Sequence, residues 1–369
     1  MIVIHPMNPG SVAVIDKISV LCKSAIDRKV FPGCVVGVVA VDEVWCRAFG
    51  RHTYEADARE VHEESIYDVA SVTKAVPVAL LALHCMDKGM LRIEDRLIDY
   101  LPECTGTYRE QITIRHLLTH TLDFGFQLSA HRHLQRDDLM EKILAAPLRS
   151  IPGTVFSYAN ATSILLGMVI ERVTGSTLDA VAERVLFGPL GMHRSGFFPE
   201  RFESKEVVPT EFDPGRGRVV HAEVHDESAH ALRPKVVGSA GLFSTVPDLL
   251  KVVRMLLDGG TCSGNRLFAS ETVALMGTNC SPAAGTSAGA GWELSQPAFM
   301  GTRCSGRTFG KTGFTGCSMV IDPEARAGVV LLSNHVHPRR QPDRSVINTV
   351  RREVADEVFG FSSISHSGD

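Results

Sequence analysis

The spacing of apolar positions divides the chain into segments with helical and strand periods. Between about residues 11 and 29 the apolar positions follow a helical period, which ends before Phe31-Pro32-Gly33. Two β-rich runs follow, CVVGVVAV and VWCRAFG, and the short polar pair Asp42-Glu43 between them predicts a hairpin. From Ser71 to about Arg184 the pattern is mostly helical.

Strand patterns return late in the chain, in the runs RTFGKTG, CSMVIDP and AGVVLLSN, and a helical pattern closes it over about residues 344–359. Turn-favouring residues stand between the last two runs, at 322–325. Strands at both ends and helices between them predict one sheet built from both ends of the chain. We expect a single unit over residues 1–369, in which about 75–235 form a mostly helical part and 10–70 with 236–360 form the sheet part.

The composition excludes several classes of protein. Hydrophobic residues make up 44% and charged residues 22%, as in ordinary folded proteins, and the formal net charge is −4. Without a basic face the chain cannot neutralise phosphates, so we expect no nucleic-acid partner. The apolar run at 35–41 ends at Asp42, and we expect no stretch long enough to span a membrane.

The first residues and the cysteines bear on the cellular compartment. The start MIVIHPMNPG lacks the basic, apolar and small-residue pattern of a signal peptide. The nine cysteines form no C-x-x-C pair, so we predict free thiols rather than a zinc site or a disulfide scaffold. We expect a cytoplasmic protein, or a periplasmic one if a leader has been removed.

The first chemical motif is Ser71-Val72-Thr73-Lys74, at the start of a long apolar segment that predicts a helix ending at Gly89. A serine and a lysine three residues apart share a helix face, so the ammonium can reach the hydroxyl. The N–H groups at a helix start also favour negative charge that develops nearby. This pattern predicts Ser71 as a nucleophile with Lys74 as its base.

Two further motifs follow in order. Tyr158-Ala159-Asn160 precedes a helical run, and a tyrosine near lysines can take a proton from a serine and pass it to a leaving group. Lys311-Thr312-Gly313 ends a predicted strand and offers donors to a substrate, with a backbone N–H just beyond it as an oxyanion donor. Each motif alone also fits a surface helix, a half-buried tyrosine or a glycine-rich turn, but all three in this order make coincidence improbable.

These residues resemble the penicillin-recognising serine hydrolases, which include class C β-lactamases, DD-peptidases and the related family VIII-type esterases. Y-A-N in place of S-D-N is typical of the class C side. No E-x-x-L-N segment, which would supply the deacylating glutamate of class A, stands out. The stretches RIEDRLIDYLPE, ITIRHLLTHT, IPGTVFSYAN, GLFSTVPDLLK and FGKTGFTGCSMVIDP extend the similarity over about residues 34–334. The resemblance implies an α+β fold, with an antiparallel sheet flanked by helices and an inserted helical subdomain.

The resemblance also implies roles for particular residues. Ser71 would be acylated, while Lys74 and Tyr158 would move protons. Asn160 and the Lys311-Thr312-Gly313 motif would bind substrate, and the backbone N–H groups of Ser71 and Phe314 would hold the oxyanion. The expected activity is hydrolysis of an ester or amide (a β-lactam, a D-amino-acid peptide or a carboxylic ester) without a cofactor. The alternative is a slow penicillin-binding or sensor protein of the same fold, and the oligomeric state stays open.

Two segments depart from the simple β-lactamase pattern. LLTHT continues as Leu122-Asp123 where many relatives have Ser-Gly, so the rim of the cleft should differ. The segment 224–227 resembles the esterase and D-aminopeptidase branches, whereas Lys311 favours substrates with a carboxylate. We expect the loops at 123–135 and 200–233 to shape the pocket.

Competing sites are weaker. Gly285-Thr286-Ser287-Ala288-Gly289 matches G-x-S-x-G, but it lies in a loop of small residues without the strand and helix that this motif needs. The pairs His131/His133 and His335/His337 lack a third ligand, so we predict no metal site. His120 is interpreted as a packing or hydrogen-bonding residue.

Overall fold

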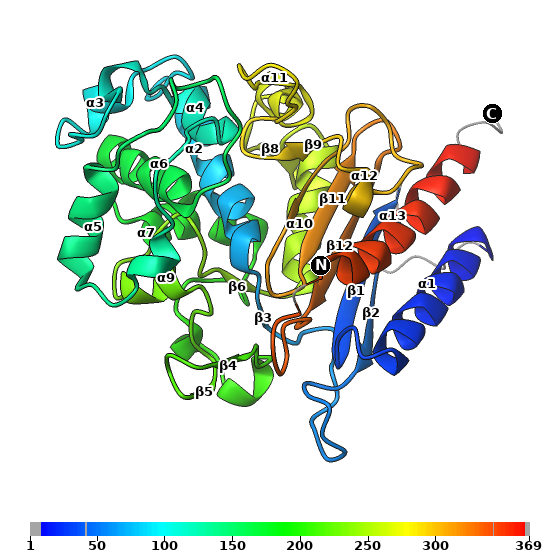
Figure 1. The fold of residues 1–369 in the computed structure, drawn as a ribbon. Helices are drawn as coiled ribbons and strands as arrows, with labels where there is room; N and C mark the ends of the chain where they lie inside the picture. Colours follow the sequence, from blue (N-terminus) through cyan, green and yellow to red (C-terminus); the bar gives the residue numbers. More distant parts are fainter. Residues whose placement is uncertain (1–8, 41–42, 342, 366–369) are drawn as a thin grey trace.

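A six-stranded antiparallel sheet, built from both ends of the chain, forms the centre of one half of the molecule (Figure 1). The computed structural model describes residues 9–40, 43–341 and 343–365. The strand order is β2-β1-β12-β11-β10-β9. The strands are β1 (Gly33–Ala40), β2 (Glu43–Gly50), β9 (Glu293–Leu294), β10 (Phe309–Thr312), β11 (Ser318–Asp322) and β12 (Ala327–Ser333). The predicted β1–β2 hairpin forms, although its turn at 41–42 lies outside the described residues.

Helices cover both faces of this sheet. Helices α1 (Pro9–Asp27) and α13 (Ser345–Ser365) pack side by side on one face, and α10 (Val246–Leu257) packs on the other (Figure 1). Strand β1 serves both layers because successive side chains point to opposite faces. Val36 and Val38 join the core under α1 and α13, and Val35 and Val39 join the core on the α10 side. The expected antiparallel sheet flanked by helices is therefore confirmed.

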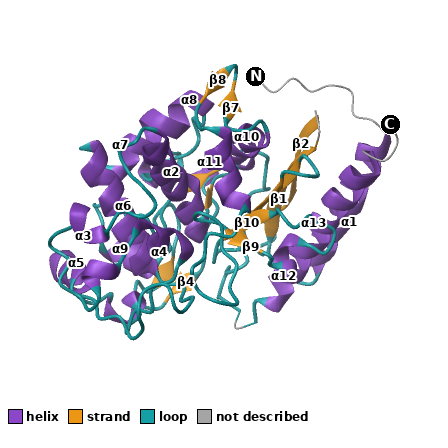
Figure 2. Cartoon of the chain, turned by 90° about the horizontal axis from the view of Figure 1, so that it is seen from above, coloured by secondary structure: helices purple, strands orange, loops and turns teal. Residues whose placement is uncertain are grey.

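The segment between the two parts of the sheet folds into helices that pack beside it (Figure 2). The remaining helices are α2 (Leu80–Asp87), α3 (Leu97–Tyr100), α4 (Ile114–Thr119), α5 (Arg136–Leu144), α6 (Asn160–Thr174), α7 (Leu178–Ala182), α8 (Gly188–Leu190), α9 (Glu227–Ala231), α11 (Ser270–Ala274) and α12 (Pro297–Met300). Three short ribbons complete the fold: β3 (Tyr67–Asp68) with β6 (Phe243–Ser244), β4 (Phe212–Asp213) with β5 (Arg218–Val219), and β7 (Thr261–Cys262) with β8 (Asn265–Arg266). The boundaries that we place near residues 75 and 235 stay a prediction.

The helix that we predicted from Ser71 to Gly89 is broken, so that expectation is wrong in part. Residues Ala70–Lys74 form a short 3₁₀ turn, and α2 begins only at Leu80. Between them Val76 has a non-helical backbone, with φ −116° and ψ 110°. The reason is Pro77, which disfavours the α conformation in the residue before it. Ser71 and Lys74 still share a face because residues i and i+3 eclipse in a 3₁₀ turn, but no long helix dipole begins at Ser71.

One apolar segment contradicts the expectation that no stretch is long enough to cross a membrane. Ala70–Asp87 has the length and apolar composition of a membrane span. It is 78% buried inside the fold, between α6 and the sheet part. Its apolar character is accounted for by this position in the core, because core helices pass the same test of composition.

Candidate active site

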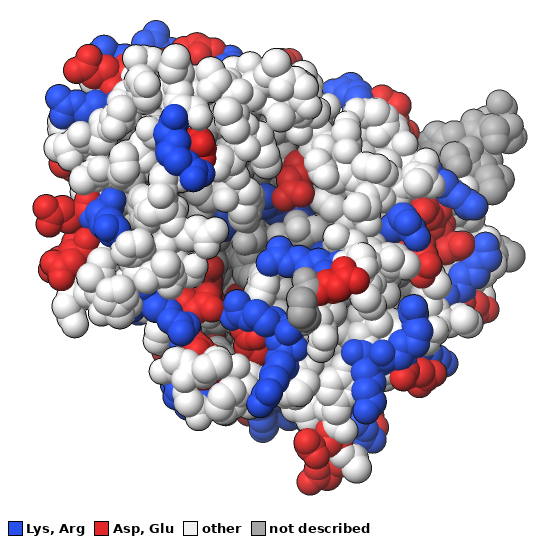
Figure 3. Space-filling model, in the orientation of Figure 1, with Lys and Arg blue, Asp and Glu red and all other residues white. Residues whose placement is uncertain are grey.

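The predicted residues meet at one cavity between the helical part and the end of the sheet formed by β9 and β10. The cavity has a volume of about 560 Å³. Figure 3 shows the hollow at the centre of this face, with side chains of both charges around it. The predicted residues that line the cavity are Ser71, Tyr158, Asn160, Lys311, Thr312, Gly313 and Phe314. Both loops that we expected to shape the pocket reach it, through Ser129 and through 225–227.

Lys74 lies directly beneath Ser71. Its Nζ is 3.1 Å from Ser71 Oγ and 2.6 Å from the backbone oxygen of Ser239, and the residue is only 2% exposed. The 3₁₀ turn explains the pairing, because it stacks the two side chains one turn apart. The hydroxyl therefore stands at the cavity wall with an ammonium as its immediate neighbour.

Tyr158 lies between two lysines. Its ring centroid is 5.1 Å from Lys74 Nζ and 4.7 Å from Lys311 Nζ. Burial of the hydroxyl end acts to raise its pKa, but the two ammonium groups and interactions with Ser71 and Lys74 hold the pKa of Tyr158 below its ordinary value. The residue as a whole is 45% exposed because it lines the open cavity. A tyrosine in this setting can give up and regain a proton.

Asn160 begins α6 and is held by an acidic neighbour. Its Nδ2 donates to Asp226 Oδ2 and to Ser228 Oγ, each at 3.0 Å. Burial acts to raise the pKa of Asp226, yet Lys74 and hydrogen bonds from Ala229, Ser228 and Asn160 keep it below the ordinary value. Because the amide nitrogen is occupied, the amide oxygen of Asn160 is the group that can be oriented toward a substrate or a lysine.

Lys311 is not a free cation. Its Nζ is 2.7 Å from Glu293 Oε1, and the lysine side chain is 2% exposed. Burial acts to lower the pKa of Lys311, but Tyr158 and Glu293 together raise it, so the ammonium is retained. Glu293 was not predicted from the sequence, because it lies on the two-residue strand β9 and has no motif around it. We expected Lys311 to favour a substrate with a carboxylate, but its ammonium already has a carboxylate partner in Glu293.

The two proposed oxyanion donors face the cavity from different elements. In the part of the chain that the structure describes, neither the backbone N–H of Ser71 nor that of Phe314 is engaged in a hydrogen bond. Gly313 lets the two segments approach closely, since a Cβ on it would lie 2.3 Å from the backbone oxygen of Val69. The geometry thus leaves both donors free for a substrate oxygen.

His120 also borders the site. Its ring centroid is 4.8 Å from that of Tyr158, and the residue is buried. Burial and the nearby Lys311 and Lys74 hold the pKa of His120 well below its ordinary value, so the ring is neutral. We interpreted it as a packing residue from the sequence, and no local pattern places it beside the tyrosine.

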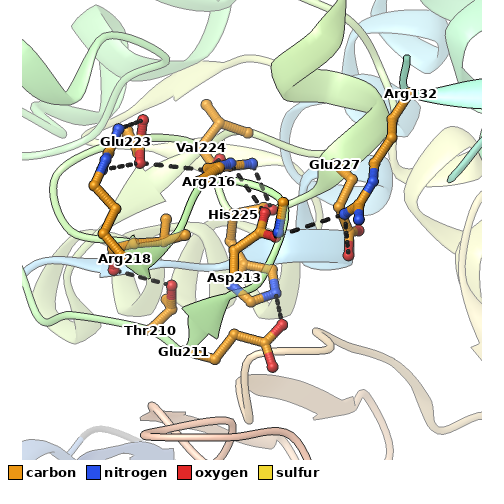
Figure 4. A network of polar contacts seen from close by, with 12 residues as sticks. Arg132, Thr210, Glu211, Asp213, Arg216, Arg218, Glu223, Val224, His225 and Glu227 are labelled. Atoms are coloured by element: carbon orange, nitrogen blue, oxygen red, sulfur yellow. Dashed lines mark hydrogen bonds and ion pairs between the residues drawn. The ribbon is translucent and has the colours of Figure 1, made fainter.

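A polar network holds the segment 210–227 against the cavity (Figure 4). His225 Nε2 is 3.2 Å from Glu211 Oε1, and Glu211 also pairs with Arg340. Burial acts to raise the pKa of Glu211, but His225 and Arg340 lower it to about 2. Arg216 and Asp213 add an ion pair of 3.1 Å at the base of the β4–β5 hairpin. The network fixes the rim residues Asp226 and Glu227.

The competing sites lack the geometry for catalysis. Ser287 lines the cavity, but its loop leads into β9 and is not flanked by the strand and helix of a nucleophile elbow. The rings of His131 and His133 stack on each other, while His335 and His337 each contact a backbone oxygen through Nδ1. Within residues 9–40, 43–341 and 343–365, no group of three His, Cys, Asp or Glu side chains could hold a metal ion.

Comparison with known proteins places this geometry in a family. The family model described as Beta-lactamase matches residues 21–351. The chain belongs to the β-lactamase family. A relative from Escherichia coli K12, named "Putative D-alanyl-D-alanine carboxypeptidase", is 30% identical over 315 residues, which cover 76% of this chain and 72% of the relative. A relative of the same name from Salmonella agona is 28% identical over 336 residues, covering 80% and 77%.

Solved structures of this β-lactamase fold superpose over almost the whole chain. "EstCE1, a hydrolase with promiscuous acyltransferase activity" is similar with a TM-score of 0.77 and 21% identity, and the match covers 96% of this chain and 100% of that one. A class C β-lactamase has a TM-score of 0.74 at 18% identity, covering 96% and 100%. At these identities the likeness shows the fold. Together with the family, it indicates a hydrolase of the β-lactamase fold.

Proposed function

We propose that this β-lactamase-family protein is a serine hydrolase that forms an acyl-enzyme on Ser71. The single observation that supports this best is the distance of 3.1 Å between Lys74 Nζ and Ser71 Oγ, at the wall of the cavity that also contains Tyr158. A surface serine and lysine would not need a buried ammonium with a second, backbone partner.

The proton of Ser71 passes to the Lys74 and Tyr158 pair as Oγ attacks the substrate carbonyl. The lowered pKa of Tyr158 suits a group that must accept this proton and then return it. When the tetrahedral intermediate collapses, the same proton goes to the leaving oxygen or nitrogen. Water then attacks the acyl-enzyme, and the same groups assist as base and acid.

The negative charge on the carbonyl oxygen develops between the backbone N–H groups of Ser71 and Phe314. Donors that are already in place need no reorganisation during the reaction, and the loss of one such donor costs about 10²–10³-fold in kcat in other enzymes. Asn160, held by Asp226, and Thr312 orient the substrate on either side of the reacting carbonyl.

The substrate class is an ester or an amide. The names of the relatives and fold neighbours support D-alanyl peptides, β-lactams and carboxylic esters as the compounds to test first. No cofactor is part of the proposal, because the nucleophile, the proton carriers and the oxyanion donors all come from the chain.

The test compares hydrolysis of 4-nitrophenyl butyrate by the wild-type protein, by Ser71→Ala and by the control Ser287→Ala. Ser287 lines the same cavity and belongs to the rival motif. We expect Ser71→Ala to lose essentially all activity and Ser287→Ala to keep it, with circular dichroism showing that both are folded. Wild-type rates in Ser71→Ala would reject the proposal.

The acylation step is tested by mass spectrometry of the intact protein. An adduct on Ser71 that forms and disappears within the turnover time supports the hydrolase. An adduct that persists for hours, without turnover of esters, β-lactams or D-alanyl peptides, would instead support a slow penicillin-binding or sensor protein.

A further inference from the structure

The charge of Lys311 is already balanced before any substrate binds. Its ammonium contacts Glu293 at 2.7 Å and faces the ring of Tyr158 at 4.7 Å. Glu293 lines the same cavity, so a substrate carboxylate at Lys311 would meet a second carboxylate there. Like charges at such separations repel, and this pair does not provide a net positive subsite.

The other cations of the cavity wall, with one exception, are also engaged. The lysines and arginines that line it are Lys311, Arg340, Arg344 and Arg351. Arg340 forms ion pairs with Glu211 and Glu227. Buried Arg351 donates to the backbone oxygens of Gly313 and Cys317 and to Asn348.

Arg344 is the exception. Among the residues that the structure describes, no acidic side chain lies within ion-pair distance of its guanidinium. The residue is exposed, and it lies at the junction of the main cavity with a neighbouring one of about 690 Å³ that extends along residues 124–130. The two cavities share Tyr158 and Asn160.

The guanidinium of Arg344 is held over the site by an aromatic ring. Its Cζ is 4.8 Å from the ring centroid of Phe314, the residue whose backbone N–H is the proposed oxyanion donor. Stacking orients a guanidinium but leaves its N–H donors available, and their planar fork matches a carboxylate. An unpaired cation is therefore presented at the wall of the cavity, beside Phe314.

We infer that Arg344 is a specificity-determining residue that binds a carboxylate of the substrate, and that Lys311 does not. The inference rests on the proposed function, and it narrows the substrates to esters or amides with a carboxylate close to the scissile bond. Lys311, paired with Glu293, acts instead on Tyr158. The carboxylate of the substrate is thus bound on the α13 side of the cleft, because Arg344 directly precedes Ser345, the first residue of α13.

The experiment compares one neutral ester with two anionic ones, using wild type, Arg344→Met, Arg344→Lys and the control Arg339→Met. Arg339 is exposed and does not line the cavity. The neutral ester is 4-nitrophenyl butyrate. The two anionic esters are the monoester of glutarate with 4-nitrophenol, whose carboxylate lies on the acyl group, and 4-carboxyphenyl butyrate, whose carboxylate lies on the leaving group. The measurement is kcat/KM at two ionic strengths.

We expect Arg344→Met to lower kcat/KM for at least one anionic ester about tenfold and to leave the neutral ester within about twofold. Arg344→Lys keeps the charge and should retain part of the preference, and Arg339→Met should match wild type. The preference of wild type for the anionic ester should weaken with salt. The relevant ratio is kcat/KM for an anionic ester divided by kcat/KM for the neutral ester. If this ratio is the same in wild type and in Arg344→Met for both anionic esters, the inference is overturned.

A binding measurement separates this inference from the proposed function. The glutarate monoester is titrated by calorimetry into Ser71→Ala and into Ser71→Ala with Arg344→Met, neither of which can use Ser71. We expect binding to weaken about tenfold in the double variant. Equal affinities would reject the role of Arg344 even if Ser71 is the nucleophile, and a loss of affinity would support it even if no ester is turned over.

Discussion

Asp68 and His225 are joined by a hydrogen bond of 2.8 Å from the backbone N–H of His225 to Asp68 Oδ2. The other carboxylate oxygen of Asp68 accepts from the N–H of Ala70 at 2.8 Å, one residue before Ser71. The backbone oxygen of Asp68 accepts from Thr315 Oγ1, just beyond Phe314. One buried residue thus ties the segment of the proposed nucleophile to the rim segment and to the strand end next to the second proposed oxyanion donor.

This relationship predicts that Asp68→Asn lowers kcat more than it changes KM. An amide of the same shape offers one acceptor oxygen, so one of the two N–H groups loses its partner and faces the amide N–H₂. We expect a loss of about 1–3 kcal/mol in the free energy of unfolding and at least a tenfold loss in kcat. Urea unfolding and ester kinetics measure the two effects. A stable, fully active variant would show that Asp68 does not position Ser71.

Gly313 predicts a second, purely steric effect. In Gly313→Ala the new Cβ would meet the backbone oxygen of Val69 at 2.3 Å, and this forces β10 away from the Ser71 segment. We expect at least a tenfold loss in kcat/KM for 4-nitrophenyl butyrate, because the oxyanion donors move apart.

The matched control for this change is Gly306→Ala, where a Cβ would meet nothing within 4 Å. It should leave both activity and thermal stability unchanged. Activity in Gly313→Ala equal to that of Gly306→Ala would mean that the close approach to Val69 is not needed for the reaction.

The pH dependence follows from the two lysines beside Tyr158. The ammonium of Lys311 helps to hold the pKa of Tyr158 below its ordinary value, so Lys311→Met removes a positive charge and the pKa of the tyrosine rises. If ionised Tyr158 accepts the serine proton, the ascending limb of the pH profile of kcat/KM must shift to higher pH.

The double variant Lys311→Met with Glu293→Gln controls for the carboxylate that the single change leaves unpaired. It should show the same upward shift, whereas Lys205→Met, at an exposed site outside the cavity lining, should show none. An ascending limb that stays in place in both Lys311 variants would exclude this role for Tyr158 in the proton transfer.

The sequence by itself determined the features that depend on local spacing. The three-residue separation of Ser71 and Lys74 puts both side chains on one face in a 3₁₀ turn as well as in an α-helix. Their contact was therefore predictable, although the 3₁₀ turn itself was not. The continuous apolar run of β1 and the helical patterns of α1, α6 and α13 likewise depend on neighbours along the chain. The break at Val76 was not predicted, because the helix expected from Ser71 to Gly89 ran through Pro77, which disfavours the α conformation in the residue before it.

Only the tertiary structure decided which charges are balanced. Glu293 meets Lys311 across two antiparallel strands, Asp68 meets His225 over 157 residues of sequence, and Arg344 reaches Phe314 from the start of α13. Such contacts depend on strand register and on the packing of α13 against the sheet, which no local periodicity encodes. For this reason the motifs predict the nucleophile, whereas the charge that a substrate meets follows from the fold.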